Sequence, residues 1–369
     1  MKIDTKDLFI ILPISFLLMT GIIMVSSSSI YIADDMTSNP FHFAQRQALF
    51  IAIGLLALIF FLLLPSEFLF RTDWIFMLIS IFLLAILFVP DVGTSVNGSI
   101  RWIRLGPINI QPSEVCKFSL ILYISGYSVR RMTEINSLRS FLKPLFLLFL
   151  ISVLIMGQPD LGSTAIVCIL VVGILFYAGI SFMQLCLLIL LIALLGYLAI
   201  TTSPMRIARI LAFTDPFAAD VVLNAGWQLS NSLISIGQGG WFGVGLGNSF
   251  QKSFYLPEAH TDFIFAILVE ELGLIGGLTL IFLFVLLFVG LVLISFDSFK
   301  KEKYFQGYAV FGIFLLIAIQ VLFNIAVNIG LLPTKGLTLP FISYGGTSII
   351  IMLSLIGIVL RINNENKIL

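Results

Sequence analysis

Charged residues are scarce in this sequence. Asp, Glu, Lys and Arg together make up 11% of its 369 residues, while hydrophobic residues make up 59%; a typical soluble domain carries about 25% charged residues. The formal net charge is +1, but the distribution of the charges carries more information than their sum. This composition excludes a soluble domain and indicates an integral membrane protein.

Histidine and cysteine are rare as well, with two and three copies. Cys116, Cys168 and Cys186 lie in apolar runs without metal-ligand spacing, so we expect them to be buried packing residues. No His-Glu-x-x-His motif is present, and the glycine-rich "GQGGWFGVGLGNS" lacks the Gly-Lys-Ser/Thr of a phosphate-binding loop. The sequence therefore predicts no metal site and no nucleotide site, and it requires no cofactor.

What the chain has instead is a series of long apolar runs. A helix needs roughly 20 apolar residues to span a bilayer, and we predict ten helices, near residues 8–30, 47–64, 74–90, 113–128, 142–157, 163–179, 181–200, 263–295, 306–330 and 346–361. The run at 263–295 is longer than a bilayer requires, so we expect it to be tilted, to be broken near Gly273, Gly276 and Gly277, or to project from the membrane. The predicted fold is an all-α polytopic membrane protein with about ten transmembrane helices in a single domain, residues 1–369.

The basic residues predict the orientation. With the N-terminus in the cytoplasm, 12 of the 20 Lys and Arg residues lie on the inner side and 7 on the outer side, and Lys117 lies within a helix. The positive-inside rule then places both termini, including Lys2 and Leu369, in the cytoplasm. The segment of about 201–262, between the seventh and eighth helices, becomes a large extracytoplasmic loop. We expect short amphipathic or re-entrant helices in it, because structureless loops of this length are uncommon.

Two ionisable groups stand at the start of the fourth helix. In "QPSEVCK", Glu114 and Lys117 are three residues apart and so share a helix face. They form either an intrahelical ion pair or a polar group that faces a functional cavity, because charges at membrane depth are costly. Asp160 in "GQPDLGS" leaves a similar choice between a helix cap and a ligand contact.

A further ionisable pair precedes the eighth helix. The segment "YLPEAHTDFIFAILVEELG" places His260 and Asp262 directly before an apolar run, where Asp262 could serve as a helix cap. Glu270 follows roughly 12 Å deeper along the axis and Glu271 points to the opposite side, so neither can form a close carboxylate pair with Asp262. A two-carboxylate glycosidase is therefore excluded.

A lone outer aspartate suits another reaction, in which it deprotonates a sugar hydroxyl while cations hold a phosphate leaving group. The cations that the outer loops offer are Arg101, Arg206, Arg209, Lys252 and Lys335.

The quoted motifs resemble one known family. "NGSIRWI" with "QPSEVCK", "GQPDLGS", "GWQLSNSLISIGQGGWFGVGLGNSFQKSFYLPEAHTDFIFAILVEELG" and "GLLPTKGLTLPFISYGGTS", in this order, are similar to the SEDS family (shape, elongation, division and sporulation) of bacterial peptidoglycan glycosyltransferases. The resemblance runs from the first helix to the last. "YLPEAHTDFIF" and "LLPTKGLTLPFISYGG" are more similar to the cell-division members than to the elongation members.

The resemblance implies an inverting glycosyltransferase. It would polymerise lipid II into glycan strands at the outer face of the bacterial cytoplasmic membrane, for septal wall synthesis, and release undecaprenyl pyrophosphate. The essential aspartate of the family matches Asp262, and Arg101, Lys117 and Arg209 are our candidates for holding the diphosphate. Some members carry a basic residue where this chain has Asn109, so no cation is implied there. The candidate substrate-binding residues are Arg101, Trp102, Gln111, Glu114, Lys117, Asp160, Arg209, Gln228, His260, Lys335 and Ser343.

The resemblance also implies partners. They are lipid II, a class B penicillin-binding protein that acts as transpeptidase, and other membrane proteins of the divisome, but no nucleic acid. A divalent cation, Mg²⁺ or Mn²⁺, could assist. The main alternative is a transporter that flips lipid II, which Glu114 and Lys117 would suit equally well. A purely structural scaffold would leave Asp262 and the outer cations without a task.

Overall fold

The computed structural model describes residues 4–96, 99–106, 108–219 and 221–367. Two positions that entered the orientation argument, Lys2 and Leu369, lie outside the described residues. The described helices are α1 (Thr5–Thr37), α2 (His42–Leu63), α3 (Ser66–Ile86), α4 (Pro112–Arg130), α5 (Leu138–Met156), α6 (Leu161–Tyr177), α7 (Phe182–Thr201), α8 (Pro204–Thr214), α9 (Trp227–Gly239), α10 (Ile264–Lys300), α11 (Tyr304–Asn328) and α12 (Gly346–Lys367).

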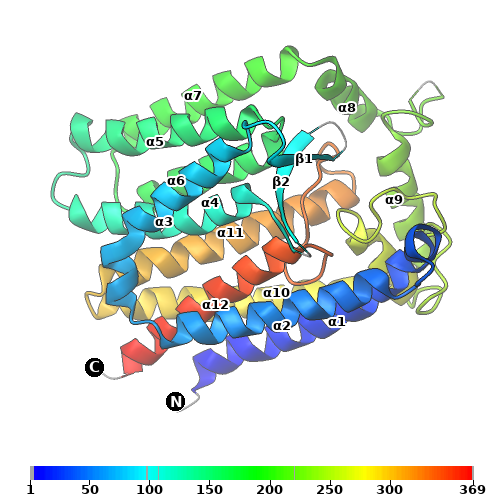
Figure 1. The fold of residues 1–369 in the computed structure, drawn as a ribbon, viewed down its shortest axis with the longest axis horizontal. Coiled ribbons are helices and arrows are strands. Elements are labelled where there is room, and N and C mark those ends of the chain that lie inside the picture. The colour runs from blue at the N-terminus through cyan, green and yellow to red at the C-terminus, as the bar shows by residue number, and fades with distance from the viewer. Residues whose placement is uncertain (1–3, 97–98, 107, 220, 368–369) are drawn as a thin grey trace.

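Each of the ten predicted helices is present, and the two additional helices, α8 and α9, lie within the predicted outer loop. Eight of the described helices are long and apolar enough to cross a membrane; α6 is also apolar but has 17 residues, and α4 carries charged side chains. The long helices lie side by side along the longest axis, with both chain ends at the same end of the bundle (Figure 1). We call this the termini end, and the opposite end, which carries α8 and α9, the loop end. The all-α polytopic prediction is confirmed.

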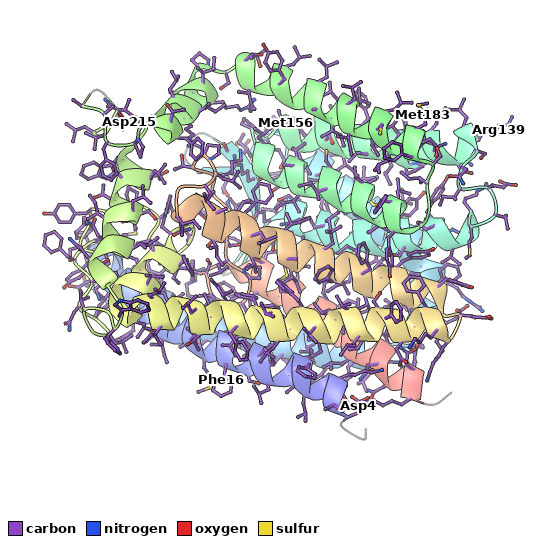
Figure 2. The ribbon with its side chains drawn as sticks, turned by 180° about the vertical axis from the view of Figure 1, so that it is seen from behind. Asp4, Phe16, Arg139, Met156, Met183 and Asp215 are labelled. Carbon is purple, nitrogen blue, oxygen red and sulfur yellow. The ribbon has the colours of Figure 1, made fainter. Side chains whose placement is uncertain are left out.

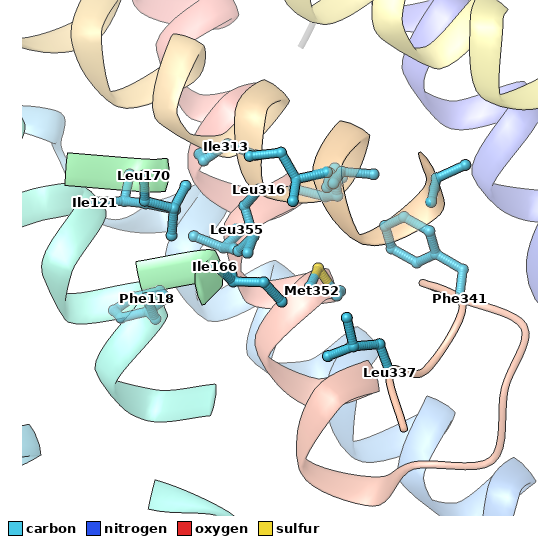
Figure 3. Close-up of a cluster of buried hydrophobic side chains, with 14 of the residues drawn as sticks. Phe118, Ile121, Ile166, Leu170, Ile313, Leu316, Leu337, Phe341, Met352 and Leu355 are labelled. Atoms are coloured by element: carbon cyan, nitrogen blue, oxygen red, sulfur yellow. The ribbon is translucent and has the colours of Figure 1, made fainter. Parts of the chain in front are cut away.

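The core of the bundle lies where α4, α6, α11 and α12 meet. Figure 3 shows Met352 and Leu355 of α12 among side chains such as Ile313 of α11, Ile121 of α4 and Ile166 of α6, all of them buried. The helices can approach closely because small residues lie between them: a Cβ at Gly357 would come within 2.4 Å of the Leu58 carbonyl oxygen on α2. Since lipid tails are as apolar as these side chains, close packing rather than water exclusion stabilises the bundle.

The outer faces of the helices remain apolar, as Figure 2 shows by the many carbon side chains that project from the bundle. Leu188 is the buried residue of α7, whereas the exposed residues of this helix include Cys186, Met183 and Tyr197. The prediction that all three cysteines are buried is therefore wrong for Cys186, since a cysteine in an apolar run can also face lipid.

The long helix α10 is broken at Gly273, which is one of the alternatives that its length predicted. Gly273 has φ 71° and ψ −175°, a conformation that is open almost only to glycine. A segment of the outer loop uses the backbone groups around the break: Val244 N–H donates to the Glu270 carbonyl (2.9 Å), and Leu274 N–H donates to the Gly240 carbonyl (2.9 Å). Irregular backbone is thus hydrogen-bonded where it borders the membrane-spanning part of α10.

A small antiparallel sheet was not predicted. Strands β1 (Gly93–Val96), β2 (Ser99–Leu105) and β3 (Ile108–Ile110) pair in the order β1-β2-β3, between the third and fourth predicted helices. The Thr347 hydroxyl of α12 donates to the Asn109 carbonyl (2.7 Å) and accepts from Gln111 N–H (3.1 Å). The sheet is thereby tied to α12 directly before α4 begins.

Candidate functional site

Asp262 lies at the end of the outer loop, two residues before α10 begins. The chain turns tightly here, and the Glu258 carbonyl accepts hydrogen bonds from the N–H groups of Thr261 (3.2 Å), Asp262 (3.1 Å) and Phe263 (3.2 Å). Glu258 itself has φ 55°, which is uncommon for a residue with a side chain. The turn fixes the backbone of Asp262 at the loop end of the bundle.

Two asparagines of α11 hold the same backbone from the other side. Asn324 Nδ2 and Asn328 Nδ2 both donate to the Asp262 carbonyl, at 2.8 and 3.1 Å. Asn328 Oδ1 also accepts from Ala266 N–H (3.1 Å) in the first turn of α10. Asn328 therefore satisfies a helix-start donor that a side-chain cap would normally take.

This arrangement leaves the Asp262 carboxylate without a capping role. The residue at the cap position of α10 is Phe263, which makes no side-chain capping bond, and within the described ranges the Asp262 carboxylate has no hydrogen-bond partner. The capping alternative for Asp262 is therefore wrong, because a neighbouring helix supplies the cap. The half-buried carboxylate faces Gly336, where a Cβ would come within 2.6 Å of Asp262 Oδ2.

Burial raises the pKa of Asp262 from 3.8 to about 7. The negative charges of Glu258 and Asp160 act in the same direction, and the positive charges of Arg101 and Arg209 oppose them. A carboxylic acid with a pKa near 7 is poised to take or give a proton at neutral pH. Strongly perturbed acids of this kind are concentrated at functional sites.

Two cations from different segments, Arg101 and Arg209, lie near enough to act on the Asp262 carboxylate electrostatically. Arg101 of β2 donates from Nε to the Gln158 carbonyl (3.3 Å), and lies 3.9 Å from Asp160 Oδ2. Lys335 lies in the loop between α11 and α12, with its stem against Gly162, and burial lowers its pKa to about 8. Arg101 and Arg209 lower the pKa of Lys335 further, while Asp160 opposes them. We call Arg101, Arg209 and Lys335 the cation group; such a cluster can hold an anion.

Asp160 lies beside the cation group and has a structural role. It caps α6, because Oδ1 accepts from Ser163 N–H (3.2 Å) and Oδ2 from the Ser163 hydroxyl (2.7 Å). The cap alternative for Asp160 is confirmed, and the carboxylate also pairs with Arg101 at longer range. Asp160 therefore positions a cation rather than offering a free ligand oxygen.

Glu114 and Lys117 form a buried ion pair inside α4. Lys117 Nζ lies 2.5 Å from Glu114 Oε1, and both side chains are almost fully buried. The second carboxylate oxygen, Glu114 Oε2, is buried without a hydrogen-bond partner. A buried unsatisfied carboxylate oxygen costs free energy, so this pair is unlike a surface ion pair and is a candidate for function.

His260 and Ser343 are predicted substrate-binding residues that lie close to Asp262. The His260 ring packs on Phe43 (4.7 Å between centroids) and Tyr344 (5.8 Å), and burial lowers its pKa. Ser343 ties two loops together, since its hydroxyl donates to the Thr261 carbonyl (2.5 Å) and accepts from Leu339 N–H (2.8 Å).

Trp102, Gln111 and Gln228 are also predicted substrate-binding residues. Trp102 is in β2 and Gln111 is at the start of α4, where its backbone bonds to Thr347. Gln228 lies half-buried in the first turn of α9. Their assignment to substrate stays a prediction.

Sequence reasoning offered Lys252 as one of the outer cations available to hold a phosphate, and its availability is contradicted by the structure. Lys252 is buried and its Nζ lies 2.8 Å from Glu271 Oε1, where it also donates to the Ser27 hydroxyl (2.9 Å). The adjacent Glu270 accepts from the Ser249 hydroxyl (2.7 Å) and Phe250 N–H (2.8 Å). These groups clamp the outer loop onto α10 beside its break, a role that position in the sequence could not show.

No metal centre is evident in the part of the chain that the structure describes: it contains no group of three or more His, Cys, Asp or Glu side chains arranged to hold an ion. At the loop end of the membrane-spanning bundle, a single carboxylate of raised pKa lies beside a group of cations. This arrangement defines a polytopic membrane protein that can remove a proton and hold an anion at the bilayer edge.

Comparison with known proteins agrees with this class. A family model described as "Cell cycle protein", which covers FtsW, RodA and SpoVE, matches residues 7–368. A relative named "Probable peptidoglycan glycosyltransferase FtsW" from Legionella pneumophila is 43% identical over 366 residues, which cover 99% of this chain and 92% of the relative. A protein of the same name from Haemophilus ducreyi is 44% identical, over 95% of this chain and 88% of its own length.

Solved structures resemble the whole fold. One, described as "Structural coordination of polymerization and crosslinking by a peptidoglycan synthase complex", aligns with a TM-score of 0.76 at 27% identity, over 96% of this chain and 97% of the other. The rod shape determining protein RodA of Thermus thermophilus aligns with a TM-score of 0.71 at 25% identity, over 96% of each chain. The chain belongs to the FtsW/RodA/SpoVE family, the SEDS family that its motifs resemble.

Proposed function

We propose that this chain is a peptidoglycan glycosyltransferase that polymerises lipid II into glycan strands and releases undecaprenyl pyrophosphate. The observation that carries the proposal is the half-buried Asp262 carboxylate, with its pKa raised to about 7, beside the cations Arg101 and Arg209. The names of the relatives, which cover nearly the whole chain, support the same activity. Their name, FtsW, and the division-like motifs favour septal wall synthesis.

In the proposed reaction, Asp262 accepts the proton of the acceptor sugar hydroxyl. The oxygen forms a bond to the anomeric carbon of the donor, and the bond from this carbon to the diphosphate oxygen breaks with inversion. The electron pair leaves with undecaprenyl pyrophosphate, and Asp262 later releases its proton to water. General-base catalysis of this kind contributes about 10²–10⁴-fold.

The cation group has the complementary task. Diphosphate is a good leaving group once its growing negative charge is countered, and we assign this task to Arg101, Arg209 and Lys335, which come from three different segments. Lys117, a candidate for this task by sequence, is instead buried against Glu114 in α4. Because the pKa of Lys335 is lowered to about 8 by burial, an arriving diphosphate would favour its charged form. A divalent cation that accompanies the diphosphate could share this task.

The distribution of the basic residues supports an orientation and a location for the protein. We propose that both termini lie in the cytoplasm, that the loop end faces outward, and that the protein resides in the bacterial cytoplasmic membrane as a single domain. A class B penicillin-binding transpeptidase is the proposed partner; a complex that couples polymerization and crosslinking is what the similar solved structure describes. Other divisome membrane proteins are proposed partners on the strength of the family.

The test uses the full chain, purified with its transpeptidase partner and supplied with lipid II in detergent. Glycan strands separated on a gel are the expected product. A protein that moves lipid II across vesicle membranes but yields no glycan would instead establish the flippase, the function that the buried Glu114–Lys117 pair also suits.

A further inference from the structure

A basic hollow lies at the termini end, far from Asp262. It has a volume of about 620 Å³ and is formed by the turn between α4 and α5 and the first turns of α5. Figure 2 shows Arg139 at the same end of the bundle as Asp4 and opposite Asp215. The residues that line the hollow are Arg131, Glu134, Ser137, Leu138, Arg139, Ser140 and Lys143.

The hollow has an excess of positive charge. Arg131 is paired with Glu134 at 2.9 Å, whereas Arg139 and Lys143 have no hydrogen-bond or ion-pair partner among the described residues. The start of α5 adds to this charge, because the N–H groups of a first helical turn carry a partial positive charge. The cavity therefore combines two unpaired cations with a helix N-terminus, which favours an anion.

An apolar track leads away from the hollow along α5. Leu138, Leu142, Phe146, Phe149 and Val153 are all exposed, with Phe146 at 70%, and their spacing of three and four residues places them on one helix face. The track is about 22 Å long at 1.5 Å per residue, and half of a bilayer core is about 15 Å thick. It can accompany acyl chains through the whole of one leaflet.

We propose that this hollow binds the phosphodiester headgroup of an anionic phospholipid, with Arg139 and Lys143 on the phosphate and the acyl chains along the α5 track. A soluble phosphate would have no use for the exposed apolar residues below the hollow. Basic pockets at helix ends bind anionic lipid headgroups in this way. The site is independent of the reaction at Asp262.

The test measures lipid affinity with the full chain. Native mass spectrometry counts retained lipid, and thermal unfolding reports stabilisation, as phosphatidylglycerol or phosphatidylcholine is titrated into detergent-solubilised protein. The Arg139→Gln/Lys143→Gln variant should bind phosphatidylglycerol about 30-fold more weakly, which corresponds to about 1 kcal/mol for each of two cations. The charge-conserving Arg139→Lys/Lys143→Arg variant should retain wild-type affinity.

A matched control loses the same charge elsewhere at this end. Arg71→Gln/Lys300→Gln changes two exposed cations on α3 and α10, and it should bind phosphatidylglycerol as the wild type does. Equal affinity of the Arg139/Lys143 variant and the wild type would overturn the proposal, as would equal binding of phosphatidylcholine. Stabilisation by glycerol phosphate alone, to the same extent as by the lipid, would assign the hollow to a soluble anion and overturn the lipid site.

Discussion

Replacing Asp262 by Asn tests the proposed base with the smallest change of shape. The amide keeps the size of the side chain but can neither accept the proton nor carry the charge. The main-chain contacts to Asn324 and Asn328 involve the Asp262 carbonyl, and the start of α10 is capped by Asn328, so the variant should fold. We expect glycan polymerisation to fall on the order of 10²-fold or more.

The same variant should change stability in a pH-dependent way. Because burial raises the pKa of Asp262 from 3.8 to about 7, the native state holds this proton more tightly than the unfolded state does. Between these two values the unfolded state binds fewer protons, so the free energy of unfolding falls as pH rises. A shift of roughly three units corresponds to at most about 4 kcal/mol; solvent screening of the half-buried carboxylate should reduce this to about 1–2 kcal/mol.

The raised pKa of Asp262 sets the direction of two pH effects, one on stability and one on rate. Asp262→Asn should match the wild type at about pH 4 and be more stable than it at about pH 8, since the amide never ionises. The wild-type rate should rise with pH on an acid limb with an apparent pKa near 7, as a general base must be ionised. The measurements are thermal unfolding of both proteins at the two pH values and glycan yield on a gel.

The catalytic role of Asp262 and the effect of its burial can be refuted separately. Near-normal glycan from a folded Asp262→Asn variant would refute the catalytic role. A stability difference that does not change with pH would refute the burial argument, even if activity were lost.

Further predictions concern the supporting groups. Lys117→Met keeps the apolar stem but leaves Glu114 buried without its cation, so the glycan yield is compared per amount of folded protein. We expect most polymerisation to be lost on that scale; normal glycan yield would make the pair structural. Lys252→Met leaves the Glu271 carboxylate buried without its cation, so we expect about 3 kcal/mol of destabilisation in chemical unfolding, and an unchanged midpoint would contradict the clamp. Asn328→Ala should lower the rate while leaving substrate affinity intact, because it loosens the backbone beside the base. Asn328→Asp keeps the acceptor for α10 but loses the amide that donates to the Asp262 carbonyl, so it should lose the same rate; a wild-type rate in Asn328→Asp would show that only the start of α10 depends on this residue. Reporter fusions after Lys301 should read cytoplasmic and one near Asn248 should read external, and the reverse pattern would overturn the orientation.

The helices could be predicted because the bilayer requires long apolar runs, and no other element of the chain has them. The start of α3 was placed eight residues late, at 74 instead of Ser66, because Arg71 and Asp73 look like loop residues. The structure pairs Asp73 with Arg130 of α4 at 2.8 Å, so a charge inside a helix is satisfied by a partner distant in sequence. The sheet at 93–110 was missed because its strands are short and interrupted by turn residues.

For the site, sequence reasoning found the aspartate but not its supports. Asp262 is recognisable because an acid beside an apolar run is costly and needs a reason. Asn324 and Asn328 sit four residues apart near the end of an apolar helix, where they could equally have been polar surface residues. Lys252 was misassigned because an outer-loop position does not reveal whether a cation reaches solvent or a buried carboxylate.

The depth of the base is set by elements that do not themselves react. α11 holds the Asp262 carbonyl through two asparagines, and the loop before Asp262 is clamped to α10 by Glu270, Glu271 and Lys252 beside the break at Gly273. A lipid-linked sugar diffuses in the plane of the membrane, so its reacting hydroxyl arrives at a nearly fixed height. A catalytic group held on rigid elements at that height avoids the entropic cost of bringing base and hydroxyl together. The break in α10 is therefore part of the proposed site, because it lets irregular backbone reach the bilayer edge with its hydrogen bonds made.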